Sequence, residues 1–179
     1  MDTSLAEKLK KVVLLVLDVD GVMTDGKIII DDVGNETKNF HVRDGHGLKL
    51  LMRGGVDVVL LTGRRSGVVR RRAEDLGVRG VYQGAKDKAQ VMGEILAERG
   101  VPGEHVAYVG DDIVDIPAFR MAGFSAAVAD SPDYVKEQAD YVTGKAGGHG
   151  AVREVCEMIL KARGEWGAVT ARYGMDGGE

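Results

Sequence analysis

Short apolar runs of strand length alternate along the chain with longer segments in which apolar residues recur at helical spacing. Six runs are predicted strands: residues 12–17, 56–61, 80–82, 105–109, 125–128 and 141–143. Three of the segments between them are predicted helices, each followed by a glycine that can end it: residues 44–53, 66–76 and 87–99. This alternation is typical of an α/β fold, a doubly wound parallel sheet of Rossmann-like type.

One segment interrupts the alternation directly after the first predicted strand. Residues 27–30 and 37–42 flank the turn-rich residues 31–36 as the arms of a β-hairpin would. Three successive isoleucines, at positions 28 to 30, put apolar side chains on both faces, and a lone hairpin is marginal in water. The inserted hairpin, at about residues 26–42, is therefore either a flap or subunit contact, or an extra edge of the main sheet.

The composition fits one globular domain. The 179 residues are 44% hydrophobic and 29% charged, and a chain of this length can bury a full core without metal or disulfide staples. We expect a single domain over residues 1–164. A glycine-rich tail follows at residues 165–179, and its last residues are expected to be disordered.

Charge and hydropathy exclude several classes of partner. A formal charge of −4 provides no broad basic field for a nucleic-acid backbone, so no nucleic acid is expected. The most apolar run is too short to span a bilayer, and the N-terminal residues do not look like a signal peptide. With a single cysteine, Cys156, the sequence predicts a cytoplasmic protein that has no membrane partner.

Two acidic clusters that follow predicted strands carry the strongest chemical signal. Carboxylates at the end of an apolar strand lose solvation and need a cation or a proton to hold them. Ligands gather at the carboxyl ends of strands in open α/β sheets, so both clusters are expected to meet around Mg²⁺, which prefers oxygen ligands. The alternative, that one of these aspartates only caps the next helix, stays open for Asp111 or Asp112 alone. The clusters hold Asp18 and Asp20, and Asp111, Asp112 and Asp115.

Two further strand ends offer groups suited to a phosphate ester. Thr62, Gly63 and Arg64 supply a hydroxyl, backbone N–H groups and a guanidinium. Lys86 and Lys88 stand near a helix N-terminus, where the helix dipole favours anions, and they are rivals for one task. An aspartate can attack phosphorus while a second acid serves the leaving oxygen, so these groups together indicate phosphoryl chemistry.

The order of these motifs resembles the haloacid dehalogenase superfamily of phosphatases. The motifs are Asp18-x-Asp20 with Thr24, then Thr62, then Lys88, then Gly110-Asp111-Asp112-x-x-Asp115. The resemblance implies four catalytic residues: Asp18 as nucleophile, Asp20 as general acid and base, and Thr62 and Lys88 as the groups that steady the phosphoryl oxygens. It implies that Asp18, Asp20 and Asp111 hold Mg²⁺, and that Asp112 and Asp115 lie around these ligands without binding the metal themselves. It also implies a capless member, because only the hairpin stands where larger relatives insert a cap domain.

A narrower resemblance, over residues 14–160, is to the family of 3-deoxy-D-manno-octulosonate 8-phosphate phosphatases. The stretches that carry it are LDVDGVMTDG, the hairpin, FHVRDGHGLK, LLTGRR, YQGAKDK, VAYVGDDIVD and AGGHGAVREVC. It implies a sugar-acid phosphate as substrate, a role in lipopolysaccharide sugar synthesis, and a homotetramer in which hairpins assemble centrally and a neighbouring subunit completes each site. The implied substrate contacts are Asp20, His41, Val42, Arg43, Asp44, Gly45, Lys49, Gly63, Arg64, Arg72 and Lys88.

The sequence departs from that family's pattern at His41, Lys49 and His149, which stand where the pattern has Asn, Arg and Arg. Two other functions stay open: a phosphatase for another nonulosonate sugar phosphate, such as a sialic-acid-like 9-phosphate, and a non-catalytic phosphatase-like oligomerisation module. Arg64 favours the octulosonate, and the intact set of acidic and basic motif residues favours an enzyme.

Helical spacing alone sets Arg72 apart from its neighbours. It shares a face with Val68, Val69 and Leu76, and a guanidinium on an apolar stripe needs an anionic partner or must reach to water. The carboxylate of a sugar acid and the solvent are the two candidate partners.

Overall fold

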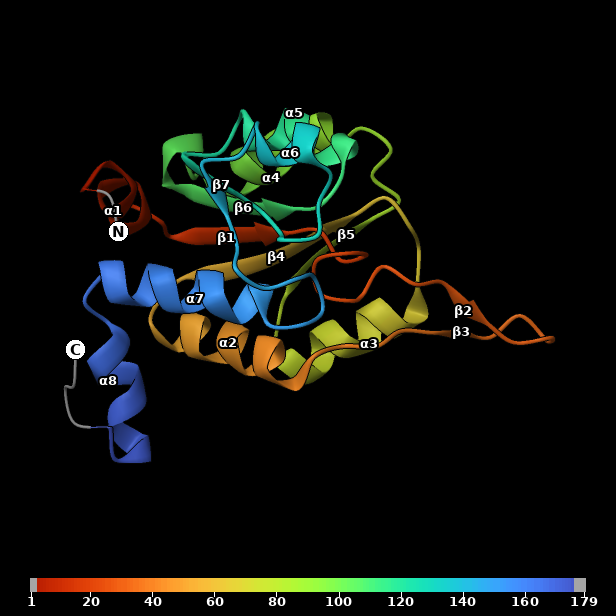
Figure 1. The fold of residues 1–179 in the computed structure, drawn as a ribbon, viewed down its shortest axis with the longest axis horizontal. Helices are drawn as coiled ribbons and strands as arrows, with labels where there is room; N and C mark the ends of the chain where they lie inside the picture. The colour runs from red at the N-terminus through yellow and green to blue at the C-terminus, as the bar shows by residue number, and fades with distance from the viewer. Residues whose placement is uncertain (1–2, 176–179) are drawn as a thin grey trace.

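A six-stranded parallel sheet runs through the centre of the computed structural model, which describes residues 3–175 (Figure 1). The strands lie in the order β5-β4-β1-β6-β7-β8. Their bounds are β1 Leu14–Leu17, β4 Asp57–Thr62, β5 Gly80–Gln83, β6 Val106–Gly110, β7 Phe124–Ala127 and β8 Tyr141–Val142. All six predicted strands are confirmed, each end within two residues.

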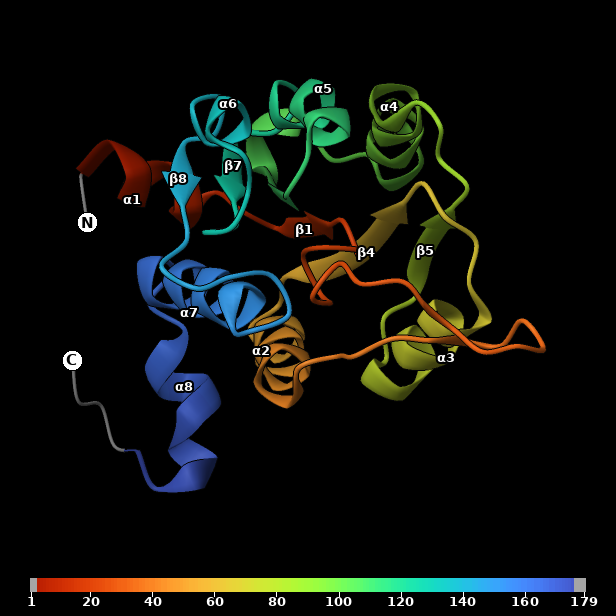
Figure 2. The same ribbon diagram turned by 45° about the vertical axis from the view of Figure 1, so that its right-hand side comes forward.

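Helices cover both faces of the sheet (Figures 1 and 2). One face carries α2 Val42–Arg53, α3 Gly67–Leu76 and α7 Ala151–Ala162, and the other carries α4 Lys88–Arg99, α5 Ile116–Phe119 and α6 Asp133–Lys136. The predicted helices correspond to α2, α3 and α4, and the last two end at Gly77 and Gly100 in the left-handed conformation, as glycine C-caps do. The α7 helix and the short α1 Thr3–Lys10 were not among the predictions.

The side chains of β1 show why the sheet needs both layers. Leu15 and Leu17 pack into the core shared with α2 and α7, whereas Leu14 and Val16 pack into the core beneath α4 and α5. All four are at most 1% exposed. A strand that is buried on both faces reads as a continuous apolar run, so the doubly wound fold is confirmed.

The inserted hairpin forms a sheet of its own. Strands β2 Ile29–Ile30 and β3 Glu36–Thr37 pair antiparallel and project from the body of the molecule (Figure 1). The alternative of an extra edge on the main sheet is therefore wrong. The arms are also shorter than predicted, because Phe40 bridges to Thr24 and Val42 already begins α2. The isoleucines at positions 28 to 30 stay between 41% and 59% exposed.

The chain reverses its direction of travel across the sheet between β1 and β6. From β1 it proceeds to β4 and β5 on one side, then returns to β6, β7 and β8 on the other. The main-chain N–H of Asp18 donates to the carbonyl of Val109 at 3.0 Å, so the residues that follow these two strands lie side by side. Such a switch point is where ligands bind in open α/β sheets.

The tail contains more structure than its composition suggests. Residues 165–175 include α8 Trp166–Thr170 and a 3₁₀ turn, Ala171–Tyr173. The disorder predicted for the last residues falls on 176–179, which lie outside the described residues. Over residues 3–175, no helix has the length and apolar character needed to cross a bilayer.

Candidate active site

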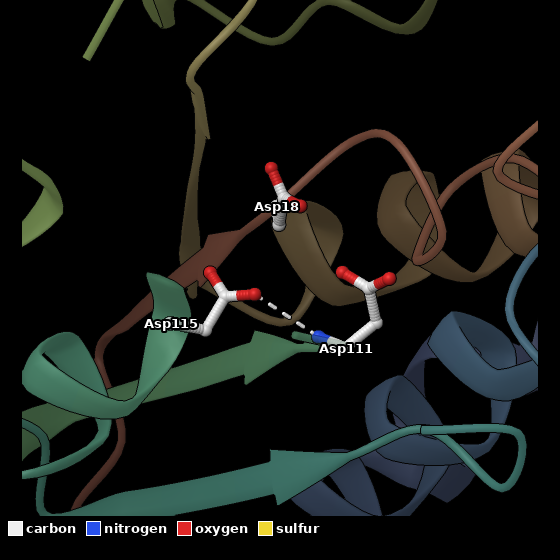
Figure 3. A group of neighbouring side chains, drawn as sticks. All are labelled: Asp18, Asp111 and Asp115. Atoms are coloured by element: carbon white, nitrogen blue, oxygen red, sulfur yellow. Dashed lines mark hydrogen bonds between the residues drawn. The ribbon is translucent and has the colours of Figure 1, made fainter. Parts of the chain in front are cut away.

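The two acidic clusters meet at the switch point, as the strand ends predict. Asp18 follows β1, and Asp111 and Asp115 follow β6. One carboxylate oxygen from each lies within 4.8 Å of the others, and Figure 3 shows the three side chains around a common space. Asp18 is 6% exposed and Asp115 is fully buried, so these charges lie largely out of water.

Lys88 provides the cation beside two of these carboxylates. Its Nζ lies 3.0 Å from Oδ1 of Asp18 and 2.6 Å from Oδ1 of Asp115. Lys88 is the first residue of α4, and the Asp87 carboxylate caps that helix by accepting from the Gln90 N–H at 3.0 Å. The rival, Lys86, is exposed at the rim. The structure therefore places Lys88, and not Lys86, against the acidic cluster.

Asp115 has hydrogen-bond partners for both of its oxygens. Besides Lys88, Oδ1 accepts from the Tyr108 hydroxyl at 2.7 Å, and Oδ2 accepts from the N–H groups of Asp111 and Asp112 at 3.1 and 3.2 Å. Asp115 therefore holds Lys88 and the loop after β6, and has little capacity left for a metal ion. Asp112 accepts from the Ile113 N–H at 2.7 Å and caps the 3₁₀ turn Ile113–Asp115, so capping is one task of Asp112.

Burial and mutual repulsion hold protons on this cluster when no metal is bound. Burial raises the pKa of Asp18 to about 6, although Lys88 opposes the shift. Burial, with the nearby charge of Asp18, raises the pKa of Asp111 to about 8. Burial opposes the charge of Lys88 itself, but Asp18 and Asp115 outweigh it and raise its pKa. Three carboxylates share one ammonium here, so the donor set fits a divalent cation that prefers oxygen ligands.

The carboxylate of Asp20 turns away from this group. It forms an ion pair with Lys38, and its Oδ2 lies 3.9 Å from Nε of Arg64. The Asp20 carboxylate is thus not part of the group formed by Asp18, Asp111 and Asp115, and its place among the metal ligands stays a prediction. Lys38 and its second partner, Glu36, lie on or beside β3, and the sequence did not point to either.

A pocket of about 310 Å³ opens above these residues. It is lined by Asp18, Asp20, Thr62, Gly63, Arg64, Ala85, Lys86, Lys88, Asp111, Asp112 and Val114. The predicted nucleophile, acid, hydroxyl, lysine and metal ligand thus share one cavity. The position of the Asp111 carboxylate requires glycine at position 21, where φ is +90° and a Cβ atom would lie 2.0 Å from Oδ2 of Asp111.

The other predicted substrate contacts lie outside this pocket, on and beside α2 and on α3. Lys49 and Arg72, with Val42 and Gly45, line a second pocket of about 300 Å³. The Arg72 guanidinium lies 5.5 Å from the centre of the Phe40 ring, and its buried Nε has no hydrogen-bond partner within residues 3–175. Within one chain, the predicted substrate residues are therefore divided between separate pockets.

Asp44 has a structural task that its sequence position did not reveal. It is 2% exposed, and its carboxylate accepts from the N–H groups of Gly150 and Arg153 at 3.2 and 2.8 Å. These bonds cap the N-terminus of α7. His41 lies beside it, with Nδ1 3.6 Å from Oδ2 of Asp44, and Arg43 lines a third pocket against α8. The Asp44 side chain is thus committed to α7, so its predicted substrate contact cannot come from a free carboxylate.

Comparisons with known proteins place the chain in a class and then in a family. A family model described as haloacid dehalogenase-like hydrolase matches residues 80–155. The fold and the site accordingly define a haloacid dehalogenase-like hydrolase. A 3-deoxy-D-manno-octulosonate 8-phosphate phosphatase from Haemophilus influenzae is 45% identical over 159 residues, which cover 89% of this chain and 88% of the relative. The chain belongs to the 3-deoxy-D-manno-octulosonate 8-phosphate phosphatase family.

Solved structures agree with this placement. The phosphatase of this name from Moraxella catarrhalis, in complex with a magnesium ion, a phosphate ion and a KDO molecule, is 41% identical with a TM-score of 0.94 and covers 97% of this chain and 99% of its own. The cobalt-bound form of the Haemophilus influenzae enzyme is 44% identical with a TM-score of 0.89, covering 93% and 98%. These metals fit the divalent-cation site that the carboxylates indicate.

Proposed function

We propose that this protein is a Mg²⁺-dependent phosphatase that hydrolyses 3-deoxy-D-manno-octulosonate 8-phosphate to the free sugar acid and phosphate. The observation that carries the proposal is the buried group in which Lys88 joins Asp18 and Asp115 beside Asp111. The similarity to a structure that contains magnesium, phosphate and KDO supports the choice of substrate.

The first step forms an aspartyl-phosphate. A carboxylate oxygen of Asp18 attacks phosphorus, the bond from phosphorus to the sugar oxygen breaks, and Asp20 gives a proton to the departing alcohol. Lys88 and the Thr62 hydroxyl lie where they can donate to the phosphoryl oxygens. Asp18 and Asp111 would hold Mg²⁺, whose charge offsets that of the phosphoryl group.

The second step returns the enzyme to its starting state. Asp20, now a carboxylate, takes a proton from a water molecule that attacks phosphorus, and the bond to Asp18 breaks with its electron pair left on the carboxylate. Phosphate leaves, and Asp20 carries the proton needed for the next turnover.

The carboxylate end of the substrate requires residues that one chain keeps apart. Arg64 lines the catalytic pocket, whereas Arg72 and Lys49 line the second pocket and Arg43 the third. A neighbouring subunit that presents its α2 residues to this pocket would join the groups, as the predicted homotetramer requires. The exposed isoleucines of the hairpin are the predicted contact between subunits. The single-domain boundary at residue 164 and the cytoplasmic location also stay predictions from the sequence.

A phosphate-release screen tests the function. The protein is assayed with Mg²⁺ on the octulosonate 8-phosphate, a nonulosonate 9-phosphate and simple sugar phosphates, with Asp18→Asn as the control for contaminating phosphatases. We expect the highest kcat/KM on the octulosonate ester, because the family match and Arg64 both favour it. A preference for the 9-phosphate, or phosphate release that Asp18→Asn does not abolish, would contradict the proposal.

A further inference from the structure

Lys38 is a buried cation on a segment that is otherwise exposed. It follows β3 of the hairpin, and its side chain is 1% exposed, whereas the neighbouring hairpin isoleucines face solvent. Its ammonium contacts Oδ1 of Asp20 and lies 3.3 Å from Oε1 of Glu36. A lysine is seldom buried this far without a partner, so these two carboxylates hold it in place.

Asp20 is left with one oxygen fixed and one oxygen free. Lys38 binds Oδ1. Oδ2 is buried and has no hydrogen-bond partner within residues 3–175, and Nε of Arg64 lies 3.9 Å from it. Asp20 also lines the catalytic pocket. A buried carboxylate oxygen without a partner is costly, so Oδ2 is available to a group of a bound ligand.

Glu36 connects this pair to the loop after β4. Its Oε1 accepts from Nη2 of Arg64 at 2.9 Å and also faces the Lys38 ammonium. Negative and positive charges therefore alternate along Asp20, Lys38, Glu36 and Arg64. This series runs from the loop after β1, through the hairpin, to the loop after β4 at the pocket. The hairpin thereby sets the orientation of a side chain that belongs to a different part of the chain.

We propose that Lys38 is a positioning residue for Asp20: it anchors Oδ1, directs Oδ2 toward the leaving oxygen, and stabilises the carboxylate that remains after proton transfer. The inference rests on the proposed function. As the bond from phosphorus to the sugar oxygen breaks, its electron pair goes to that oxygen, which takes the proton from Oδ2. The negative charge that appears on Asp20 then lies against a preoriented ammonium, which favours the transition state over the ground state.

Three variants isolate this role. Lys38→Met keeps length and removes charge, Lys38→Arg restores charge, and Lys27→Met makes the same change on the same hairpin at a lysine that is exposed and pairs with Asp25. On the octulosonate ester, we expect Lys38→Met to lower kcat about 100-fold with KM within threefold, since misdirecting a catalytic group costs about this much. The kcat of Lys38→Arg should be at least tenfold higher than that of Lys38→Met. The kcat of Lys27→Met should match the wild type.

An aryl phosphate separates positioning from general damage. Nitrophenolate leaves without a proton, so p-nitrophenyl phosphate needs no acid in the first step but still needs Asp20 for the second. In rapid-mixing experiments, Lys38→Met should release a stoichiometric burst of nitrophenol at the wild-type rate, followed by slow turnover. With the sugar phosphate, the same variant should show a slow first step.

Three results would overturn the inference: kcat within threefold of wild type in Lys38→Met, loss of the nitrophenol burst, or no recovery in Lys38→Arg. If Lys38→Met does not fold, Glu36→Gln replaces it, and we expect a kcat loss of several-fold with the burst retained. A wild-type enzyme that rejects the octulosonate ester but shows an Asp18-dependent burst would refute the proposed substrate alone, and the Lys38 test would proceed on the aryl ester.

Discussion

Two buried lysines flank the catalytic pocket, and the molecule supports them in opposite ways. Lys88 is the first residue of α4, and its partners Asp18 and Asp115 follow the two central strands, β1 and β6. Lys38 follows a hairpin strand. The strands of this hairpin are two residues long, and its isoleucines are exposed. The first is held by residues that follow the two central strands, and the second stands on a short hairpin with exposed apolar side chains. We therefore expect changes at Lys88 to act on stability and changes around Lys38 to act on turnover and assembly.

The largest effect on kcat is expected at Asp18, one of the two partners of Lys88. Asp18→Asn keeps the shape of the side chain but removes the nucleophile, so kcat should fall by about 10,000-fold or more. The melting temperature should not drop, because burial already disfavours the charged form of Asp18. Steady-state kinetics and thermal melts measure both. Turnover within tenfold of wild type would exclude Asp18 as the nucleophile.

Lys88→Met should destabilise the protein more than Lys38→Met does. It leaves Asp115 fully buried without its cation, and breaking a buried pair in this way costs about 3 kcal/mol. The partners of Lys38, Asp20 and Glu36, have side chains that are 22% and 18% exposed, so water can reach the oxygens that Lys38 leaves. Urea unfolding of the two variants gives the comparison. Equal losses in the free energy of unfolding would show that Lys38 stabilises the fold as much as Lys88 does.

The metal-free protein should become less stable as pH rises. The pKa of Asp111 is about 8 in the folded protein and near 3.8 when unperturbed, so between these values the folded state binds more protons than the unfolded state. Stability therefore falls from about pH 4 to pH 8. Because Mg²⁺ must displace this proton, its affinity should rise about tenfold per pH unit up to pH 8. Asp111→Asn should flatten the stability profile. Calorimetric titrations of Mg²⁺ at several pH values provide the check, and an affinity that is independent of pH would contradict it.

A charge on the exposed side of the hairpin should disturb assembly and leave the sheet intact. We expect Ile30→Asp to shift the protein to smaller oligomers and to lower kcat/KM about tenfold, because hot-spot apolar contacts carry most of an interface. Tyr134→Asp changes another exposed side chain, on α6, and serves as the control. Light scattering with chromatography reports the mass. An unchanged mass and unchanged kcat/KM would remove the hairpin from the subunit contact.

The smallest effect is expected at the exposed rival lysine. Lys86→Ala should change kcat/KM by less than about threefold, since an exposed charge near a site contributes little. A loss comparable to that of Lys88→Met would mean that the two lysines share the phosphoryl oxygens.

Local pattern was enough to predict the sheet and the acidic cluster. Apolar runs identify strands that are buried on both faces, and strand ends in parallel sheets converge, so the meeting of Asp18 with Asp111 follows from chain order. Lys38 could not be found in this way, because a lysine after a short hairpin strand reads as a solvated side chain. Its burial depends on Asp20, 18 residues earlier, and on Arg64 through Glu36. The capping task of Asp44 was hidden for the same reason, since Gly150, the N-cap residue of α7, lies 106 residues later. Both cases rest on contacts that only the folded chain creates.

The central claim is that Asp18 becomes covalently phosphorylated within a metal-dependent site. The most direct measurement is mass spectrometry of peptides from enzyme that is acid-quenched during turnover of the octulosonate 8-phosphate with Mg²⁺. We expect the mass of one added HPO₃ group on the peptide that contains Asp18, and we expect this added mass to be absent without Mg²⁺ and in Asp18→Asn. Rapid phosphate release with no added mass on that peptide, or the added group on another residue, would contradict it.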